Sequence, residues 1–316
     1  MDVVLLFPGQ GSQKPGMAKD LVETFSAARD IFERADEALG MSLSTLAFDG
    51  PADDLTLTHN AQPALLAHGA AVWAVTRDVI GADVVAAAGH SLGEFTAYHA
   101  ANALGLEDAL RLVRRRGELM YESGVRRPGA MAAILGHTNR SIEEICLQAS
   151  AEAGLVVPAN YNSPGQIVIS GEKAGVERAM AICKEEGAKR SMPLKVSGAF
   201  HSPLMETAEA GLREALDDAT FENPHFSVYA NVNAEAVMEA SRAKQLLLDQ
   251  LTKAVCWTKE IETLAARYPD ALYVEMGPNS VLKNLVHKIA PNLKTVACGT
   301  AAEVEHLRQL AGAGVA

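Results

Sequence analysis

The sequence has few cysteines, no long apolar run and no excess of basic residues, and each of these absences excludes a class of protein. Its 316 residues include only four cysteines, Cys146, Cys183, Cys256 and Cys298, and no Cys-x-x-Cys pair. Neither a zinc cage nor a disulfide framework fits this spacing, so we expect no metal site. We interpret the cysteines as small buried hydrophobic residues in a reducing compartment, which predicts a cytoplasmic protein.

Long apolar runs and an excess of basic residues are also missing. The longest uncharged stretch, around residues 60–76, contains Asn, Gln, His and Pro, whereas a membrane span needs about 20 mostly apolar residues. The first apolar run follows Asp2 rather than a basic residue and ends at Pro8, unlike a signal peptide. With 28 Lys and Arg against 39 Asp and Glu, the formal net charge is −11. We therefore expect neither a membrane nor nucleic acid as a partner.

The composition that remains is typical of a folded globular protein, with 48% apolar and 21% charged residues. Short apolar runs alternate with helical stretches over most of the chain. Strands are predicted at residues 3–7, 84–88, 227–231, 271–276 and 294–297, and helices near residues 94–104, 204–216, 242–251, 259–267 and 280–289. This alternation predicts a mainly parallel sheet with helices on both faces.

The middle of the chain breaks this rhythm. The predicted order is strand, helix, strand, strand, helix, strand, at residues 130–135, 141–153, 155–160, 166–170, 174–186 and 189–196. That order is typical of a ferredoxin-like unit. We therefore predict a small ferredoxin-like subdomain at residues 128–197, inserted into a large α/β domain formed by residues 1–127 and 198–316, with a ligand cleft between them.

A Gly-x-Ser-x-Gly pattern, Gly89 to Gly93, follows one of the predicted strands and precedes a predicted helix. In that context the pattern indicates a nucleophile elbow, in which glycines permit a sharp turn that exposes the hydroxyl of Ser91. The N–H groups at the start of the helix would face a developing oxyanion. A glycine-rich structural turn is the alternative, and the flanking strand and helix favour the catalytic interpretation.

A serine nucleophile needs a base, and nine histidines are available. His201 lies in residues 197–203, which lead from the predicted subdomain back to the large domain and would face the cleft. Spacing alone does not separate this role from that of a surface histidine. With an ordinary pKa near 6.5, such a base would make the rate fall as the pH drops through that value.

Residues 107–123 form an arginine-rich helical segment. At about 100° per residue, positions 106, 109, 110, 113, 117 and 120 share an apolar face. Arg116 lies at one edge of this face, Arg114 flanks the other side, and Arg115 points the opposite way. An arginine near the core favours a carboxylate or phosphate partner, and a structural salt bridge explains it equally well at this stage.

Five motifs follow one another along nearly the whole chain: FPGQGSQ at residues 7–13, GHSLGEF at 89–95, RG at 116–117, NYNSPGQ at 160–166 and GAFHS at 198–202. In this order they closely resemble malonyl-CoA:acyl-carrier-protein transacylases. The resemblance implies an α/β-hydrolase-like core with a ferredoxin-like insertion, which agrees with the pattern of strands and helices. Two residues depart from the family pattern: Ala254 stands where a proline is usual, and Asn102 where a glycine is usual.

The resemblance also implies roles for individual residues. Ser91 would be the nucleophile, His201 the general base, and Gln250 the residue that orients the histidine through its main-chain carbonyl. The backbone N–H groups of Gln10 and Leu92 would form the oxyanion hole. No aspartate completes a triad, so the expected catalytic unit is a dyad.

Substrate recognition follows from the same resemblance. Arg116 would clamp the free carboxylate of the malonyl group, and Asn160 and Asn162 would contribute to substrate binding. Phe200 would leave less room for an α-methyl group on the substrate. The expected partners are malonyl-CoA and an acyl carrier protein of fatty-acid or polyketide synthesis, with no bound cofactor. The oligomeric state stays open, with a monomer as the expectation.

The carrier proteins of this family are acidic, so an acidic enzyme needs a local basic patch for docking. The candidates are Arg111, Arg114, Arg115, Arg126, Arg127, Lys189 and Arg190, all of which fit a solvated charged surface equally well.

Two other functions compete with this interpretation. A serine esterase would use the same elbow, with Asp270 and His287 as its acid and base, but the HGGG-type oxyanion motif is absent. A non-catalytic module that binds the carrier would leave Ser91, His201 and Arg116 unexplained.

Overall fold

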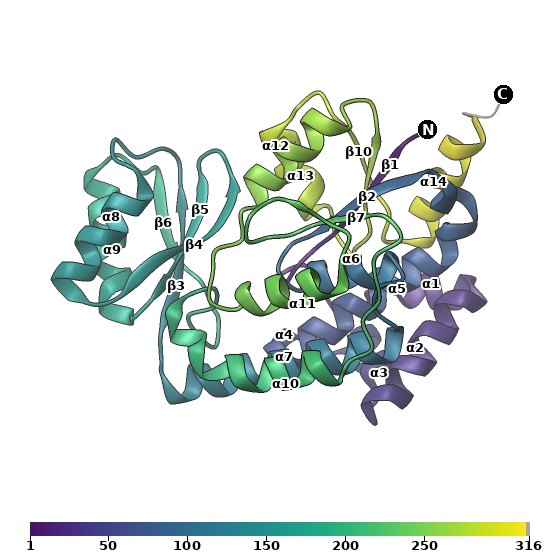
Figure 1. Ribbon diagram of the computed structural model, residues 1–316, viewed down its shortest axis with the longest axis horizontal. Coiled ribbons are helices and arrows are strands. Elements are labelled where there is room, and N and C mark those ends of the chain that lie inside the picture. Colours follow the sequence, from purple (N-terminus) through teal and green to yellow (C-terminus); the bar gives the residue numbers. More distant parts are fainter. Residues whose placement is uncertain (314–316) are drawn as a thin grey trace.

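The computed structural model describes residues 1–313 and contains two sheets (Figure 1). The larger sheet has the strand order β10-β9-β1-β2-β7-β8, formed by Lys294–Ala297, Leu272–Glu275, Val3–Phe7, Val84–Gly89, Ser227–Tyr229 and Ala236–Val237. All its neighbouring strands are parallel except the β7/β8 pair. The predicted mainly parallel sheet is confirmed, and the short antiparallel strand β8 was not anticipated.

Helices cover both faces of this sheet because its central strand is apolar at every position. In β1, Val3, Leu5 and Phe7 pack into one hydrophobic cluster, and Val4 and Leu6 into another on the opposite face. Such a continuous apolar run is expected of a parallel strand buried on both sides. The helices of the large domain are α1 Lys19–Thr24, α2 Ser26–Leu39, α3 Leu43–Asp49, α4 Ala52–Thr56, α5 Thr58–Ile80, α6 Leu92–Ala100, α7 Leu106–Arg126, α10 Glu209–Asp218, α11 Ala240–Asp249, α12 Trp257–Arg267, α13 Val281–Ile289 and α14 Ala301–Ala313.

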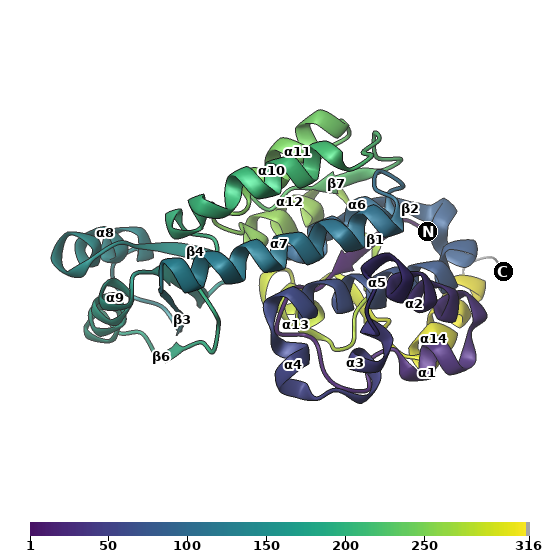
Figure 2. The same cartoon turned by 90° about the horizontal axis from the view of Figure 1, so that it is seen from below.

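The second sheet is antiparallel and has the order β4-β5-β3-β6, formed by Val156–Ser163, Gln166–Gly171, Ala130–Leu135 and Arg190–Pro193. Helices α8 (Ile142–Ala153) and α9 (Lys173–Glu185) pack on one face, around Ile134 and Ile169. This is the ferredoxin-like arrangement expected from the sequence. Figure 2 shows α7 extending from the large sheet to this unit. The exact division of the chain at residues 128 and 197 stays a prediction.

Several predicted boundaries of strands and helices were wrong. The strand expected over residues 189–196 ends at Pro193, and the helix expected from residue 204 begins with a 3₁₀ turn, Pro203–Ala208. Helices α1 to α5 were not assigned from the sequence. Helix α6 ends at Ala100, and Asn102 then adopts φ 56°, a left-handed conformation that asparagine tolerates better than most residues. That conformation explains why a glycine fits this position.

Ala254, the other departure from the family pattern, lies in the connection between α11 and α12. The next residue keeps its backbone pairing with the small sheet, since Val255 N donates to Ala159 O (2.9 Å) and Tyr161 N donates to Val255 O (2.9 Å). The connection is therefore held without a proline. Among residues 1–313, no helix is both long and apolar enough to cross a membrane.

Candidate active site

Ser91 lies in a sharp turn between β2 and α6, with φ 52° and ψ −108°. Two glycines make this turn possible because the chain passes too close to its neighbours for any side chain. A Cβ atom on Gly93 would lie 2.0 Å from the carbonyl oxygen of Phe7, and one on Gly89 would lie 1.9 Å from the carbonyl carbon of Gly93. The predicted elbow geometry is present, with the serine at the start of a helix.

His201 faces Ser91 across the site. Its Nε2 lies 2.9 Å from Ser91 Oγ, and its Nδ1 lies 2.8 Å from the carbonyl oxygen of Gln250. Because a carbonyl can only accept, Nδ1 carries the proton and the lone pair of Nε2 points at the serine hydroxyl. The three residues therefore form a serine–histidine pair with a main-chain carbonyl as its orienting group.

The environment of His201 disfavours its charged form. The side chain is 4% exposed, and burial together with the charge of Arg116 lowers the pKa of His201 to about 3. The sequence predicted an imidazole that titrates near 6.5. In the structure the imidazole is instead neutral, and able to accept a proton, throughout the physiological pH range.

Arg116 is 1% exposed and reaches the nucleophile from α7. Its Nη2 donates to Ser91 Oγ (3.1 Å) and to Gln250 Oε1 (2.8 Å), and its Nη1 donates to Gln62 Oε1 (2.7 Å). Burial lowers the pKa of Arg116 to about 10, and the carboxylate of Glu94 opposes that shift. The guanidinium therefore stays charged at neutral pH, beside the serine hydroxyl.

Two backbone amides complete the surroundings of Ser91. The N–H groups of Gln10 and Leu92 donate to no group within residues 1–313, whereas the neighbouring N–H of Gly93 donates to His90 O (2.9 Å). The side chain of Gln10 is tied to Thr58 Oγ1 (3.2 Å), which holds its loop beside the helix α5. Both amides belong to residues that line the pocket at Ser91.

The pocket is a cavity of about 120 Å³ whose lining comes from the small sheet and from loops and helices next to the large sheet. Its residues are Gln10, Gln62, His90, Ser91, Leu92, Arg116, Met120, Met131, Asn160, Leu194, Val196, Phe200 and His201. Asn160 and Phe200 line this pocket, whereas Asn162 lies outside its lining, with Oδ1 2.8 Å from His90 Nε2. Residues two positions apart share a face in a regular strand, but the register of β4 is irregular between Pro158 and Asn160 and again between Tyr161 and Ser163. These irregularities break the alternation, so the two asparagines need not point the same way. The part of all three residues in substrate binding stays a prediction.

Sequence reasoning missed a set of buried polar residues that support the site: Gln62, Glu94, Asn231 and Glu260. Each is 0–1% exposed. Two signals in the sequence could have marked members of this set: Gln62 directly precedes the apolar run at residues 63–67, and Glu94 lies within the GHSLGEF motif at residues 89–95. Burial raises the pKa of Glu94 to about 7 and that of Glu260 well above its usual value.

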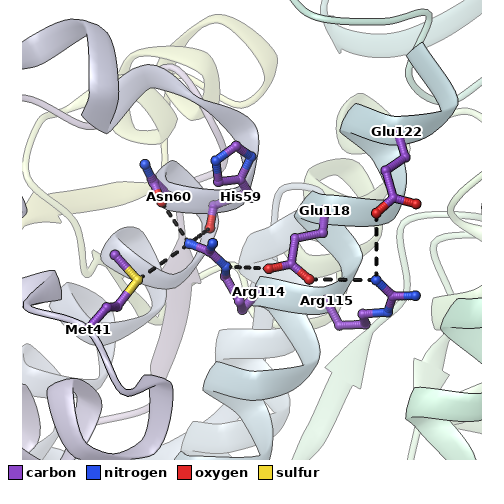
Figure 3. Close-up of polar contacts among 7 residues, drawn as sticks. All are labelled: Met41, His59, Asn60, Arg114, Arg115, Glu118 and Glu122. Atoms are coloured by element: carbon purple, nitrogen blue, oxygen red, sulfur yellow. Dashed lines mark hydrogen bonds and ion pairs between the residues drawn. The ribbon is translucent and has the colours of Figure 1, made fainter. Parts of the chain in front are cut away.

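The alternative arginines of α7 point elsewhere (Figure 3). Arg114 donates to Glu118 (2.7 Å), Asn60 Oδ1 (2.7 Å) and His59 O (3.2 Å), and Arg115 is ion-paired with Glu118 and Glu122. Neither lines the pocket at Ser91. Arg116 is therefore the arginine placed to bind an anion at the nucleophile.

The residues needed by a serine esterase are not brought together. Asp270 and His287 are both exposed, and His287 lies on α13, away from the pocket lining. The imidazole that meets Ser91 is that of His201. In the described part of the chain, no three His, Cys, Asp or Glu side chains are grouped so that they could hold a metal ion.

Comparison with known proteins gives concordant matches. A family model described as "Acyl transferase domain" matches residues 4–305. The malonyl CoA-acyl carrier protein transacylase of Bacillus subtilis is 44% identical over 303 residues, 96% of this chain and 95% of the relative, and that of Escherichia coli K12 is 42% identical over 288 residues, 91% and 93%.

Solved structures agree. The acyl-carrier-protein S-malonyltransferase of Bartonella henselae superposes with a TM-score of 0.94 at 41% identity, covering 99% of this chain and 100% of that one. A malonyl-transacylase solved in complex with its type II PKS acyl-carrier protein has a TM-score of 0.93 at 37% identity, covering 98% and 100%.

The lowered pKa of His201 predicts an unusual pH profile for the reactivity of Ser91. We expect the rate of modification of Ser91 by a serine-directed sulfonyl fluoride to change less than about threefold between pH 8 and pH 5, because the base stays neutral there. An imidazole with a pKa of 6.5 would slow the reaction about thirtyfold at pH 5. The measurement is the rate of inactivation against pH, with His201→Ala as the control that should react very slowly at every pH. A thirtyfold decline would contradict the assigned environment.

Proposed function

The chain belongs to the acyl transferase family, and on that premise we propose that it moves a malonyl group from malonyl-CoA to the phosphopantetheine thiol of an acyl carrier protein, through an ester on Ser91. The observation that carries the proposal is the buried, charged guanidinium of Arg116, 3.1 Å from the serine oxygen. A hydrolase of simple esters has no use for this charge, and a module that only binds carriers has no use for the Ser91–His201 pair.

In the first half-reaction, Ser91 Oγ attacks the thioester carbonyl while its proton passes to His201 Nε2. The carbonyl oxygen becomes an oxyanion, which the N–H groups of Gln10 and Leu92 would bind. Collapse of this intermediate breaks the carbon–sulfur bond, and the CoA sulfur takes the proton from His201. In the second half-reaction the carrier thiol attacks the carbonyl of the Ser91 ester and gives its proton to His201. The resulting intermediate collapses, the bond to Ser91 Oγ breaks, and Oγ takes the proton back from His201. Every proton and bond is accounted for by the chain, malonyl-CoA and the carrier thiol, so the proposal includes no cofactor.

Arg116 gives this reaction its substrate preference. A malonyl carboxylate entering a buried site loses its water, and the planar guanidinium replaces it with charge-assisted hydrogen bonds. An acetyl group leaves the same charge unpaired. Bound carboxylate also offsets the positive charge that lowers the pKa of His201, which strengthens the base only when malonyl is present.

Met131 and Asn160 belong to the predicted subdomain at residues 128–197, whereas Ser91 and Arg116 belong to the large domain. We propose that the reaction takes place between these two units. A cytoplasmic location is part of the same proposal, since the buried cysteines carry no disulfide in the described residues.

The carrier would dock where the two connections between the units lie together. Gly124 packs against Ser197, so the end of α7, with the exposed Arg126 and Arg127, lies beside the returning segment. In that segment Lys195 is exposed, between two residues that line the pocket. None of these three cations has an ion-pair partner among residues 1–313, whereas Arg111, Arg114 and Arg115 are all paired. Arg126, Arg127 and Lys195 therefore form a positive rim for an acidic carrier. Lys189 and Arg190, also exposed, lie at the start of β6.

Removal of the nucleophile tests the covalent step. After incubation with malonyl-CoA and no carrier, the intact mass of the protein should rise by one malonyl group, and Ser91→Ala should show no increase. Intact-protein mass spectrometry makes the measurement. A malonyl adduct on the Ser91→Ala protein would disprove the assignment, and an adduct absent from the unmodified protein would favour a carrier-binding module.

Removal of Arg116 tests the source of malonyl selectivity. Losing one partner of a buried charge pair costs about 2–5 kcal/mol, so Arg116→Ala should slow malonyl transfer to Ser91 by roughly thirtyfold to several thousandfold. Acetyl transfer should change little. The readout is the ratio of malonyl to acetyl acylation rates within each variant, which does not depend on the fraction of folded protein.

The matched control is Arg115→Ala, one position along the same helix. Its ion pairs with Glu118 and Glu122 are partly exposed, so its loss should leave the malonyl-to-acetyl ratio unchanged. Retained selectivity in Arg116→Ala, or lost selectivity in Arg115→Ala, would show that the carboxylate is bound elsewhere.

The docking surface is tested on the preformed malonyl-enzyme with two acceptors, the holo carrier protein and free pantetheine. Reversing two rim charges, Arg127→Glu with Lys195→Glu, should slow transfer to the carrier roughly tenfold at low salt, because each exposed charge contributes about 0.5–1 kcal/mol to the encounter. Transfer to pantetheine should not change.

The control for this test is Arg77→Glu, at the far end of α5. Thr58, the first residue of that helix, contacts the site, and 19 residues later the chain is about 28 Å away. Equal slowing with both acceptors, or an equal effect of Arg77→Glu, would reject this surface.

A further inference from the structure

Four fully buried polar side chains lie behind Ser91, on the side away from the pocket: Glu94, Asn231, Gln250 and Glu260, each 0% exposed. Two of them are carboxylic acids. The burial of such groups lowers the stability of the fold unless each of them has a hydrogen-bond partner. None of the four lines the pocket, so the binding of substrate does not explain them.

Asn231 is at the centre of this group and contacts the elbow on both sides of His90. Its Nδ2 donates to the carbonyl oxygen of Gly89 (2.7 Å), and its Oδ1 accepts from the N–H of Ser91 (2.7 Å). One carboxamide thus bridges two backbone groups of the turn that presents the nucleophile. No other side chain in residues 1–313 bonds to both ends of this turn.

The surrounding groups permit only one orientation of that carboxamide. Both carboxylate oxygens of Glu260 lie 3.1 Å from Nδ2, on the same side as the Gly89 carbonyl. The Nε2 donor of Gln250 lies 3.1 Å from Oδ1, on the same side as the Ser91 amide. Acceptors therefore surround the NH₂ group and donors surround the oxygen, so a flipped amide would face four mismatched partners.

The backbone of Asn231 is held as well. Its N–H donates to Glu94 Oε2 (3.1 Å), which also accepts from Gln250 Nε2 (2.7 Å). Gln250 in turn accepts from Arg116 and, through its carbonyl oxygen, from His201. The same network therefore reaches the nucleophile turn, the proposed base and the proposed carboxylate clamp.

The Ser91 backbone needs such a brace. A non-glycine residue at φ 52° and ψ −108° is strained by roughly 1–3 kcal/mol, and a conformation of this kind persists only where its surroundings hold it. The direction of Oγ depends on that conformation, and an error of about 1 Å in the position of a reacting atom can lower a rate about a hundredfold.

We propose that Asn231 is a positioning residue for the nucleophile: its carboxamide, oriented by Glu260 and Gln250, clamps the Gly89–Ser91 turn so that Oγ points at His201 Nε2. This inference rests on the proposed role of Ser91. The clamp also occupies the Ser91 N–H, which leaves the N–H of Leu92 as the first amide of α6 that is free to bind an oxyanion.

The test compares the steady-state kinetics of malonyl transfer from malonyl-CoA to free pantetheine in Asn231→Ala and the isosteric Asn231→Asp, which replaces the donor facing Gly89 and Glu260 with an acceptor. Each should lower kcat about a hundredfold, with KM for malonyl-CoA within threefold and the malonyl-to-acetyl ratio unchanged, because Arg116 is untouched. Glu260→Gln keeps an acceptor for Nδ2 and should retain kcat within about threefold, whereas Glu260→Leu should lose much of it.

Asn60→Ala is the matched control for stability. Asn60 is also buried, at 8% exposed, and its carboxamide also bridges two groups, Asp54 O and Arg114. It should lower the melting temperature without changing kcat. Asn231→Asp keeps the shape of the side chain and gives a folded comparison should Asn231→Ala not fold.

A value of kcat within threefold of the unmodified enzyme in folded Asn231→Ala or Asn231→Asp would overturn the clamp. So would a loss that appears in KM alone. Failure of the proposed function would look different, because a malonyl adduct would then be absent from the unmodified protein or would persist in Ser91→Ala, whatever happens at Asn231.

Discussion

A guanidinium with 1% of its surface exposed stays charged only where other groups replace the water it has lost. Around Arg116 those groups are the side-chain oxygens of Gln62 and Gln250, the hydroxyl of Ser91 and, through Gln250, the carboxylate of Glu94. These partners come from α5, α6 and the end of α11, so one buried side chain links three helices through hydrogen bonds. Burial, together with this charge, lowers the pKa of His201, and in the proposed function the same charge selects for an anionic acyl group.

The sequence was sufficient where function is carried by contiguous residues. The alternating apolar runs predicted the parallel sheet, and the strand, turn and helix around Ser91 predicted its elbow. For His201 and Arg116 the patterns left alternatives open, because a histidine in a connecting loop and an arginine at the edge of an apolar stripe have several common uses. Resemblance to a family favoured these two residues, and in the structure His201 Nε2 and Arg116 Nη2 lie 2.9 and 3.1 Å from Ser91 Oγ.

The support behind Ser91 was not predictable from the sequence, because its members lie far apart along the chain. Asn231 is 140 residues from Ser91, and Glu260 lies on α12, where an acidic residue on a helix ordinarily indicates a solvated surface. Asn162 was misplaced for a related reason. A motif shows that residues occur together, whereas the direction of each side chain depends on strand register and bulges that only the folded backbone determines.

The two amides of the proposed oxyanion hole have a further property that follows from strand pairing. Phe7 and Gly89 are direct partners in adjacent parallel strands, and Gln10 and Leu92 each lie three residues beyond them. Neighbouring strands are about 4.8 Å apart, and an oxygen bound by two N–H groups at about 2.9 Å requires donors at most about 5.8 Å apart. The register of β1 and β2 therefore sets where both loops leave the sheet, and a change in twist between these strands would shift the two amides of the proposed oxyanion hole relative to each other without touching any side chain in the pocket.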